Sequence, residues 1–170
     1  PPDACPDTPQ WSADGKQFAF PNITANSVEL WVGDAVSGKL RQVPGAQLNP
    51  MFGGEVHWMP DQKTLLVKLV PQGTGAPPAE PLVPEGPSIQ ESTGKQGQSS
   101  TYEKRDALNN KHDENLFDYY AATQLALVDT ATLGITPIGK LGNFDAILPA
   151  PDGRHVLVAA IHKPYSYLTT

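Results

Sequence analysis

One short signature recurs three times along this chain of 170 residues, and the repetition constrains the fold more than any single residue does. It reads WSADGK at residues 11–16, WMPDQK at 58–63 and PAPDGR at 149–154, and each copy leads into apolar residues. A second pair of similar stretches lies between these copies, LWVGDAVSGK at 30–39 and LALVDTATLG at 125–134. Two alternating units therefore build the chain.

The spacing of the first signature locates an insertion. Asp14 and Asp61 are 47 residues apart, whereas Asp61 and Asp152 are 91 apart, about one more period of ~45 residues plus an extra stretch of similar size. Composition marks the same stretch, because residues 71–87 hold six prolines. We therefore place an irregular insertion at residues 71–118.

Each signature predicts a turn that leads into a strand, because Asp can bond its own backbone two residues on and Gly tolerates a positive φ. In residues 64–70, the side chains of Leu65, Val67 and Leu69 occupy one face, and those of Leu66 and Val70 occupy the other. A strand that is apolar on both faces is typical of a position between two sheets. The expected strands, antiparallel to their neighbours, are residues 17–20, 28–33, 64–70, 123–129 and 155–161, with a possible short helix at 103–110 or 113–119.

Repeated units of this period are typical of four-stranded β-propeller blades, whereas a β-sandwich would not repeat one signature at a fixed offset. Without the insertion, about 122 residues remain. That is fewer than three blades of ~45 residues, and propellers close with typically 4 to 8. The expected fold class is therefore all-β, a partial β-propeller of two to three blades over residues 1–170 with the insertion within it.

An open stack of blades exposes apolar faces that are normally covered. We expect them to contact further blades, a partner chain or a second copy in a homo-oligomer. The residues expected on the two open faces are Val28, Leu30 and Val32 on one side and Val156 and Val158 on the other.

Charge and composition exclude several classes of protein. A net charge of −6 and a pI of about 5.1 make a broad nucleic-acid surface improbable. No apolar stretch approaches the ~20 residues that a membrane span needs. The single cysteine, Cys5, rules out an internal disulfide framework and leaves the compartment open. No cofactor is expected.

The amino-acid sequence of the insertion and of the stretches around it resembles that of a known family. The stretches that carry the resemblance are PEGPSIQE at 84–91, TYEKRD at 101–106, HDENLFDYY at 112–120, QLALV at 124–128 and HKPYSYL at 162–168. They are similar to the amino-terminal propeller of glutamyl endopeptidase-like enzymes, which belong to the prolyl oligopeptidase family of serine peptidases.

The resemblance implies a protease of two parts, a propeller that controls substrate access and an α/β-hydrolase domain with Ser, Asp and His. It also implies a periplasmic or secreted location. A nucleophile elbow needs the string G-x-S-x-G, which does not occur in this sequence. We therefore assign no catalytic residue to this chain, which is expected to be a fragment supplying the non-catalytic part of the hydrolase.

Cleavage after glutamate would need a cation for the substrate carboxylate. Arg105, with Lys104 beside it, lies in the insertion and is the predicted substrate-binding pair, although a solvated loop pair is the ordinary reading of two such cations. His112, Asp113 and Glu114 resemble a metal cluster, but such a string usually begins a solvated helix, and no metal site is expected.

Two function classes remain open. The first is the propeller portion of a serine peptidase that cleaves peptides after glutamate. The second is a non-enzymatic β-propeller binding module of the cell envelope, which would share the turns but lack the insertion. The insertion favours the peptidase.

Overall fold

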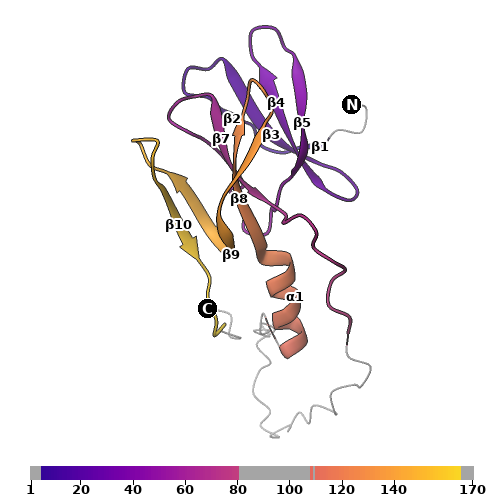
Figure 1. Ribbon diagram of the computed structural model, residues 1–170. Coiled ribbons are helices and arrows are strands. Elements are labelled where there is room, and N and C mark those ends of the chain that lie inside the picture. Colours follow the sequence, from indigo (N-terminus) through magenta and orange to yellow (C-terminus); the bar gives the residue numbers. More distant parts are fainter. Residues whose placement is uncertain (1–4, 81–107, 109, 166–170) are drawn as a thin grey trace, which may run out of the picture. The chain divides into compact units, whose positions relative to one another are not determined.

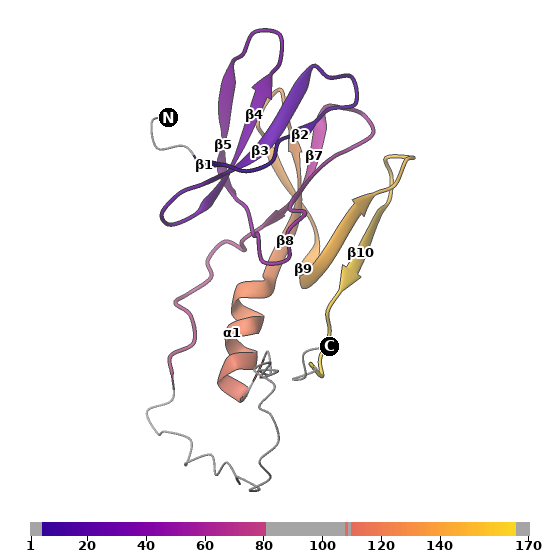
Figure 2. The same cartoon turned by 180° about the vertical axis from the view of Figure 1, so that it is seen from behind.

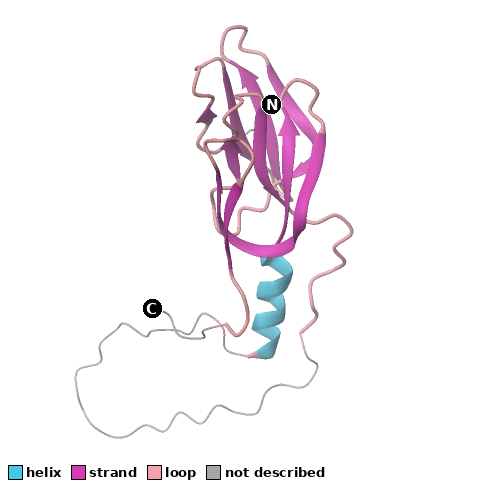
Figure 3. Ribbon diagram, turned by 60° about the vertical axis from the view of Figure 1, so that its left-hand side comes forward, coloured by secondary structure: helices cyan, strands magenta, loops and turns pink. Residues whose placement is uncertain are grey.

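The computed structural model describes residues 5–80, 108 and 110–165, and within these ranges strands dominate and one helix is present (Figure 1; Figure 3). The elements in chain order are β1 (Cys5–Pro6), β2 (Gln10–Trp11), β3 (Gln17–Ile23), β4 (Val28–Asp34), β5 (Leu40–Gln47), β6 (Val56–Trp58), β7 (Thr64–Leu69), α1 (Lys111–Ala121), β8 (Ala122–Asp129), β9 (Ile135–Pro149) and β10 (Val156–Ala160). The five expected strands correspond to β3, β4, β7, β8 and β10. The second of the two expected helices lies within α1, and the first falls almost entirely outside the described residues.

The chain divides into two compact units. The first joins Pro1–Thr74 to Tyr120–His162 and contains every strand named above, and the second joins Gly75–Tyr119 to Lys163–Thr170 and contains most of α1. The mostly β character expected from the sequence is confirmed.

Two antiparallel sheets make up the first unit. One has the strand order β1-β3-β4-β5, with β2 also paired to β3, and the other has the order β10-β9-β8-β7-β6. Strands β2 to β5 and β6 to β9 therefore repeat one four-stranded meander. The long strand β9 has two partners, because residues 135–143 pair with β8 and residues 144–149 pair with β10.

The first repeated signature forms the same turn each time. The Asp carboxylate accepts a hydrogen bond from the backbone N–H two residues on, at 3.1 Å for Asp14, 2.9 Å for Asp61 and 2.9 Å for Asp152. The residue after each Asp has a φ between 57° and 68°. The bond from the N–H of Lys16 holds the pKa of the Asp14 carboxyl below its usual value. The expected turn chemistry is confirmed.

The second repeated stretch forms another turn, identical in its two copies. Asp34 and Asp129 each accept hydrogen bonds from the backbone N–H groups two and three residues on. Each also accepts from the hydroxyl of the third residue, Ser37 or Thr132, at 2.9 Å. The repeat is therefore visible at the level of single hydrogen bonds.

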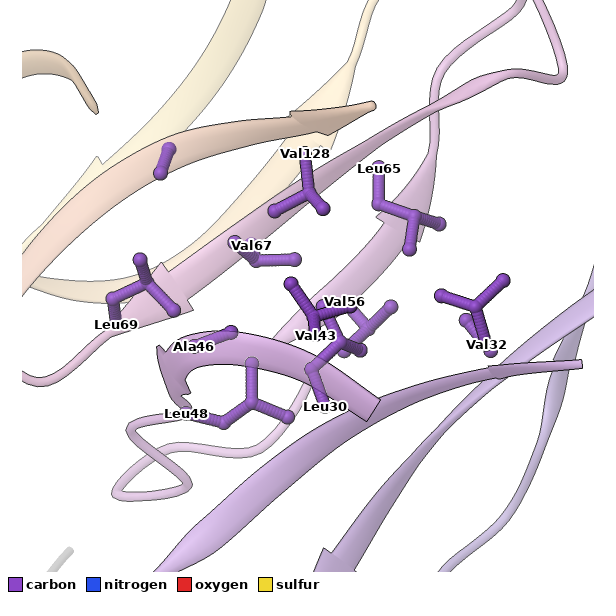
Figure 4. Close-up of a cluster of buried hydrophobic side chains, with 12 residues drawn as sticks. Leu30, Val32, Val43, Ala46, Leu48, Val56, Leu65, Val67, Leu69 and Val128 are labelled. Carbon is purple, nitrogen blue, oxygen red and sulfur yellow. The ribbon is translucent and has the colours of Figure 1, made fainter. Parts of the chain in front are cut away.

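The main core lies between the two sheets. Side chains of β4 and β5 face those of β7 and β8, with Leu30, Leu65 and Val67 wholly or almost wholly buried (Figure 4). Leu66, on the other face of β7, packs in a second cluster with Met59, Leu125 and Ile147. Both faces of β7 are therefore covered, as expected from its pattern.

The expected open face through Val28, Leu30 and Val32 is wrong. Leu30 and Val32 are buried in the core between the sheets, and Val28 packs against it. The reason is strand alternation: the neighbouring positions on β3 and β4 point to the opposite face. That face carries a row of aromatic rings with neighbouring centroids 5.0 to 6.5 Å apart, formed by Trp11, Phe18, Phe20 and Trp31.

Strand β10 is mostly exposed. Val156 packs against the second cluster, so its expected place on an open face is wrong, whereas Val158, on the same face, is 40% exposed as expected. Leu157, on the other face of the strand, is 68% exposed. The expectation that residues 155–161 lie between two sheets is therefore not met within this chain, because no described segment covers the outer face.

Candidate functional site

The predicted substrate-binding residues Lys104 and Arg105 lie outside the described residues. Their role stays a prediction. The part of the insertion that the structure describes is its root, where β7 ends and β8 begins. We therefore built the candidate site from the residues at that root.

The chain leaves β7 beside a pocket of about 380 Å³. Val70, Pro71 and Gln72, the first residues after the strand, form part of its wall, and the other lining residues are Gly45, Leu69, Gln124, Ile135, Pro137 and Leu141. The pairing register shifts in both outer strands near this pocket, in β5 opposite β4 and in β9 opposite β8. Such bulges bend a strand and widen the space beside it. The pocket is mostly apolar, with the amides of Gln72 and Gln124 in its lining.

The chain returns to the sheet where α1 runs directly into β8 (Figure 2). Asn49, which follows β5, is buried there, and its side-chain amide lies 3.0 Å from the carbonyl oxygen of Tyr120 and 3.0 Å from that of Ala122. The same nitrogen is 3.1 Å from the hydroxyl of Thr123. A residue far away in sequence therefore bonds one carbonyl in the last turn of α1 and one at the start of β8.

The second unit ties α1 to two other segments. Asp118 accepts hydrogen bonds from the ammonium group of Lys163 and from the hydroxyl of Tyr165, and the bond to Asp118 raises the pKa of Lys163. The ring of Tyr165 also meets Phe117 edge to face, with centroids 4.8 Å apart. The hydroxyl of Tyr119 donates to the carbonyl oxygen of Gly75 at 2.6 Å. These contacts hold the described part of this unit together.

A buried cation lies in β7, on the face toward β9. Lys68 is only 1% exposed, and its ammonium nitrogen makes long contacts of 3.5 and 3.3 Å with the carbonyl oxygens of Phe144 and Asp145. Asp145 is an extra residue in β9, where the register with β10 shifts, so its carbonyl lacks a regular ladder partner. Burial lowers the pKa of Lys68, and the charges of Glu55 and Asp145 oppose that shift. Sequence reasoning missed this residue.

The lowered pKa of Lys68 predicts a pH dependence with a definite sign. At a pH between the pKa of Lys68 in the folded chain and its unfolded value near 10.4, Lys68 is protonated in the unfolded chain and neutral in the folded chain. The contribution of Lys68 to the free energy of unfolding therefore rises with pH in this interval. The stability of the wild type relative to Lys68→Met should therefore rise between pH 7 and pH 10 in urea denaturation. Lys140→Met, at an exposed position, is the matched control for the loss of one lysine charge. A flat difference for Lys68→Met would contradict the assigned shift.

Two further polar residues, His155 and Asn22, lie close to acidic side chains. His155 lies 2.7 Å from the carboxylate of Asp152 within the third turn. Asn22, the first residue of a formal glycosylation sequon, is 4% exposed and donates to Glu29 at 3.2 Å, so its amide is not accessible for modification in the folded chain. In the ranges described, no three His, Cys, Asp or Glu side chains gather into a set that could hold a metal ion.

The chain is similar to known proteins over most of its length. No protein-family model matches the chain. It is 37% identical over 168 residues to the "Probable glutamyl endopeptidase, chloroplastic" of Oryza sativa subsp. japonica, and 35% identical over 167 residues to the protein of the same name from Arabidopsis thaliana. Each alignment covers 93% of this chain but 17% of the relative, so the chain spans about a sixth of these proteins' length.

Among solved structures, acylaminoacyl peptidase of Pyrococcus horikoshii has a similar fold, with a TM-score of 0.54 and 18% identity over 93% of this chain and 21% of that chain. The fold of the chain is thus similar to part of a solved peptidase, and its sequence is similar to one segment of the curated relatives. More narrowly, it is a homologue of one part of the glutamyl endopeptidases.

These relatives do not support the expected location. Both curated relatives are described as chloroplastic, so the periplasmic or secreted location of this chain stays a prediction. Among the residues that the structure describes, no helix is long and apolar enough to cross a membrane.

Proposed function

We propose that this chain is a non-catalytic β-propeller portion of a serine peptidase that cleaves peptides after glutamate. The observation that carries the proposal is the 37% identity over 168 residues to a glutamyl endopeptidase, which runs through both sheets and the insertion. The rest of the propeller and the α/β-hydrolase domain would then belong to the same protein, and the whole chain of 170 residues would control access of the peptide substrate.

Repeat register supports the blade assignment. Leu65 and Val67 face the first sheet, and the offset of 47 residues makes Phe18 and Phe20 their equivalents. The aromatic row is then the face that a preceding blade covers. The offset of 91 residues makes Leu157 the equivalent of Leu66, so its exposed side chain belongs to the face that a following blade covers.

Recognition of glutamate is assigned to the insertion, residues 71–118. Burying a substrate carboxylate needs a fixed cation, most effectively a bidentate arginine. Arg105, assisted by Lys104, is the proposed partner because it lies in the element that the plain repeat lacks, whereas Arg41 and Arg154 follow turns. Arg41 already donates to the carbonyl oxygens of Thr130 and Ala131.

Activity measurements test the proposed division of labour. The isolated 170 residues should hydrolyse neither peptide nor ester substrates, because no nucleophile elbow can be formed from them. The complete protein should cleave after glutamate and lose that activity to a serine-directed inhibitor. Turnover by the pure isolated chain that resists such an inhibitor would reveal a site in this chain and overturn the assignment.

A further inference from the structure

Residues 47–49 contact the chain directly before and directly after the insertion, and we call them the clasp. On the outgoing side, the backbone N–H of Asn49 donates to the carbonyl of Lys68 at 2.9 Å, and the N–H of Val70 donates to the carbonyl of Gln47 at 2.9 Å. Between them Leu48 forms a bridge with Leu69. The clasp is thus hydrogen-bonded to the last residues of β7, directly before the insertion begins.

On the returning side, the contacts come from the side chain of Asn49. Its two amide hydrogens are shared among three acceptors, the carbonyls of Tyr120 and Ala122 and the hydroxyl of Thr123. The Thr123 hydroxyl itself donates to the carbonyl of Ala121 at 2.9 Å, and the Asn49 oxygen accepts from the N–H of Met51 at 3.1 Å. All polar atoms of a side chain that is only 4% exposed are therefore used.

The sequence of α1 explains why an outside cap is needed. A helix leaves its last four carbonyls without partners, and a glycine just beyond the end or a cation in the last turn commonly satisfies them. Here the helix passes straight into Ala122 and Thr123, with no glycine, and its last turn contains no basic residue. The amide of Asn49 bonds the carbonyl of Tyr120, and the Thr123 hydroxyl bonds that of Ala121.

We infer that Asn49 is a positioning residue, which joins the outgoing and returning ends of the insertion and fixes the point at which α1 ends. The ladder between β7 and β8 stops at Leu69 and Gln124, and the clasp joins the two chain segments directly beyond that point. Farther along the insertion, the Tyr119 hydroxyl also donates to the Gly75 carbonyl. Its bearing on catalysis rests on the proposed function, in which the insertion serves substrate recognition.

Asn49→Asp in the complete protein tests this inference. The carboxylate keeps the acceptor for Met51 but loses both donors and faces two carbonyl oxygens. Because a helix cap is lost, hydrogen exchange of the backbone amides at residues 119–123 should become faster by on the order of five- to tenfold. Exchange of the sheet amides should change little. Asn26→Asp, at an exposed loop position, adds the same charge and should leave exchange unchanged. Unchanged exchange at residues 119–123 in Asn49→Asp would overturn the clasp.

Kinetics separate this inference from the proposed function. The ratio of kcat/KM for Glu over Gln substrates should fall at least severalfold in Asn49→Asp, and also in Arg105→Ala. If the ratio falls in Arg105→Ala alone, the positioning role is wrong and the proposed function stands. If Arg105→Ala leaves the ratio unchanged, glutamate recognition is wrongly assigned to Arg105. The hydrogen-exchange result then tests the positioning role of Asn49 by itself. Should Asn49→Asp fail to fold, Asn49→Ser is the second variant, because the shorter side chain does not extend as far toward the carbonyls of Tyr120 and Ala122 and adds no charge. It should raise exchange at the same amides, and no increase would count against the clasp.

Discussion

Leu30→Ala should lower the free energy of unfolding by about 2–5 kcal/mol, because the side chain is fully buried between the two sheets and its removal leaves a cavity in a packed core. Leu157→Ala is the matched control in the isolated chain. The same change at a side chain that is 68% exposed should cost at most about 0.5 kcal/mol. Urea denaturation of both variants measures the difference. Equal costs would mean that the sheets do not meet through the face that carries Leu30.

Arg105→Ala should lower kcat/KM of the complete protein more for Glu substrates than for Gln analogues. A charge-assisted contact to the substrate carboxylate is worth on the order of 1–3 kcal/mol, which corresponds to a ratio change of about five- to 150-fold. Lys104→Ala should have a smaller effect, because an ammonium group cannot make the bidentate contact. An equal loss for both substrates would assign Arg105 to general substrate binding, and no loss would remove it from recognition.

Strands built on an apolar run could be predicted from the sequence, and strands interrupted by Pro or Gly could not. Residues 64–70 and 123–129 are nearly continuous apolar runs, and they correspond to β7 and β8. Strand β5 was not expected, because Pro44 and Gly45 interrupt it, and Gly45 has a φ of 77°. The bulge that these residues form depends on packing between the sheets, which local sequence does not encode.

The face that each strand presents was harder to predict than the strand itself. The pattern of residues 28–33 marked apolar positions correctly but did not say which sheet face finds a partner, so Leu30 and Val32 were placed on an open face. Lys68 could have been expected to be buried, because it lies two residues after Leu66 and therefore on the same, covered face of the strand. Asn49 carried no signal, because its role depends on carbonyl groups more than 70 residues away in sequence.

The chain's place in a larger propeller is tested most directly by asking whether its outer sheet faces are covered in the complete protein. Hydroxyl-radical footprinting of the complete protein measures this through Leu157 and Trp11, which are 68% and 56% exposed in this chain. With blades on both sides, both side chains should be modified far more slowly than their exposure here implies, with Leu157 approaching the rate of buried Leu30, while Val36, 88% exposed at a turn, stays reactive. Modification of Leu157 and Trp11 at rates typical of exposed side chains would contradict the propeller assignment.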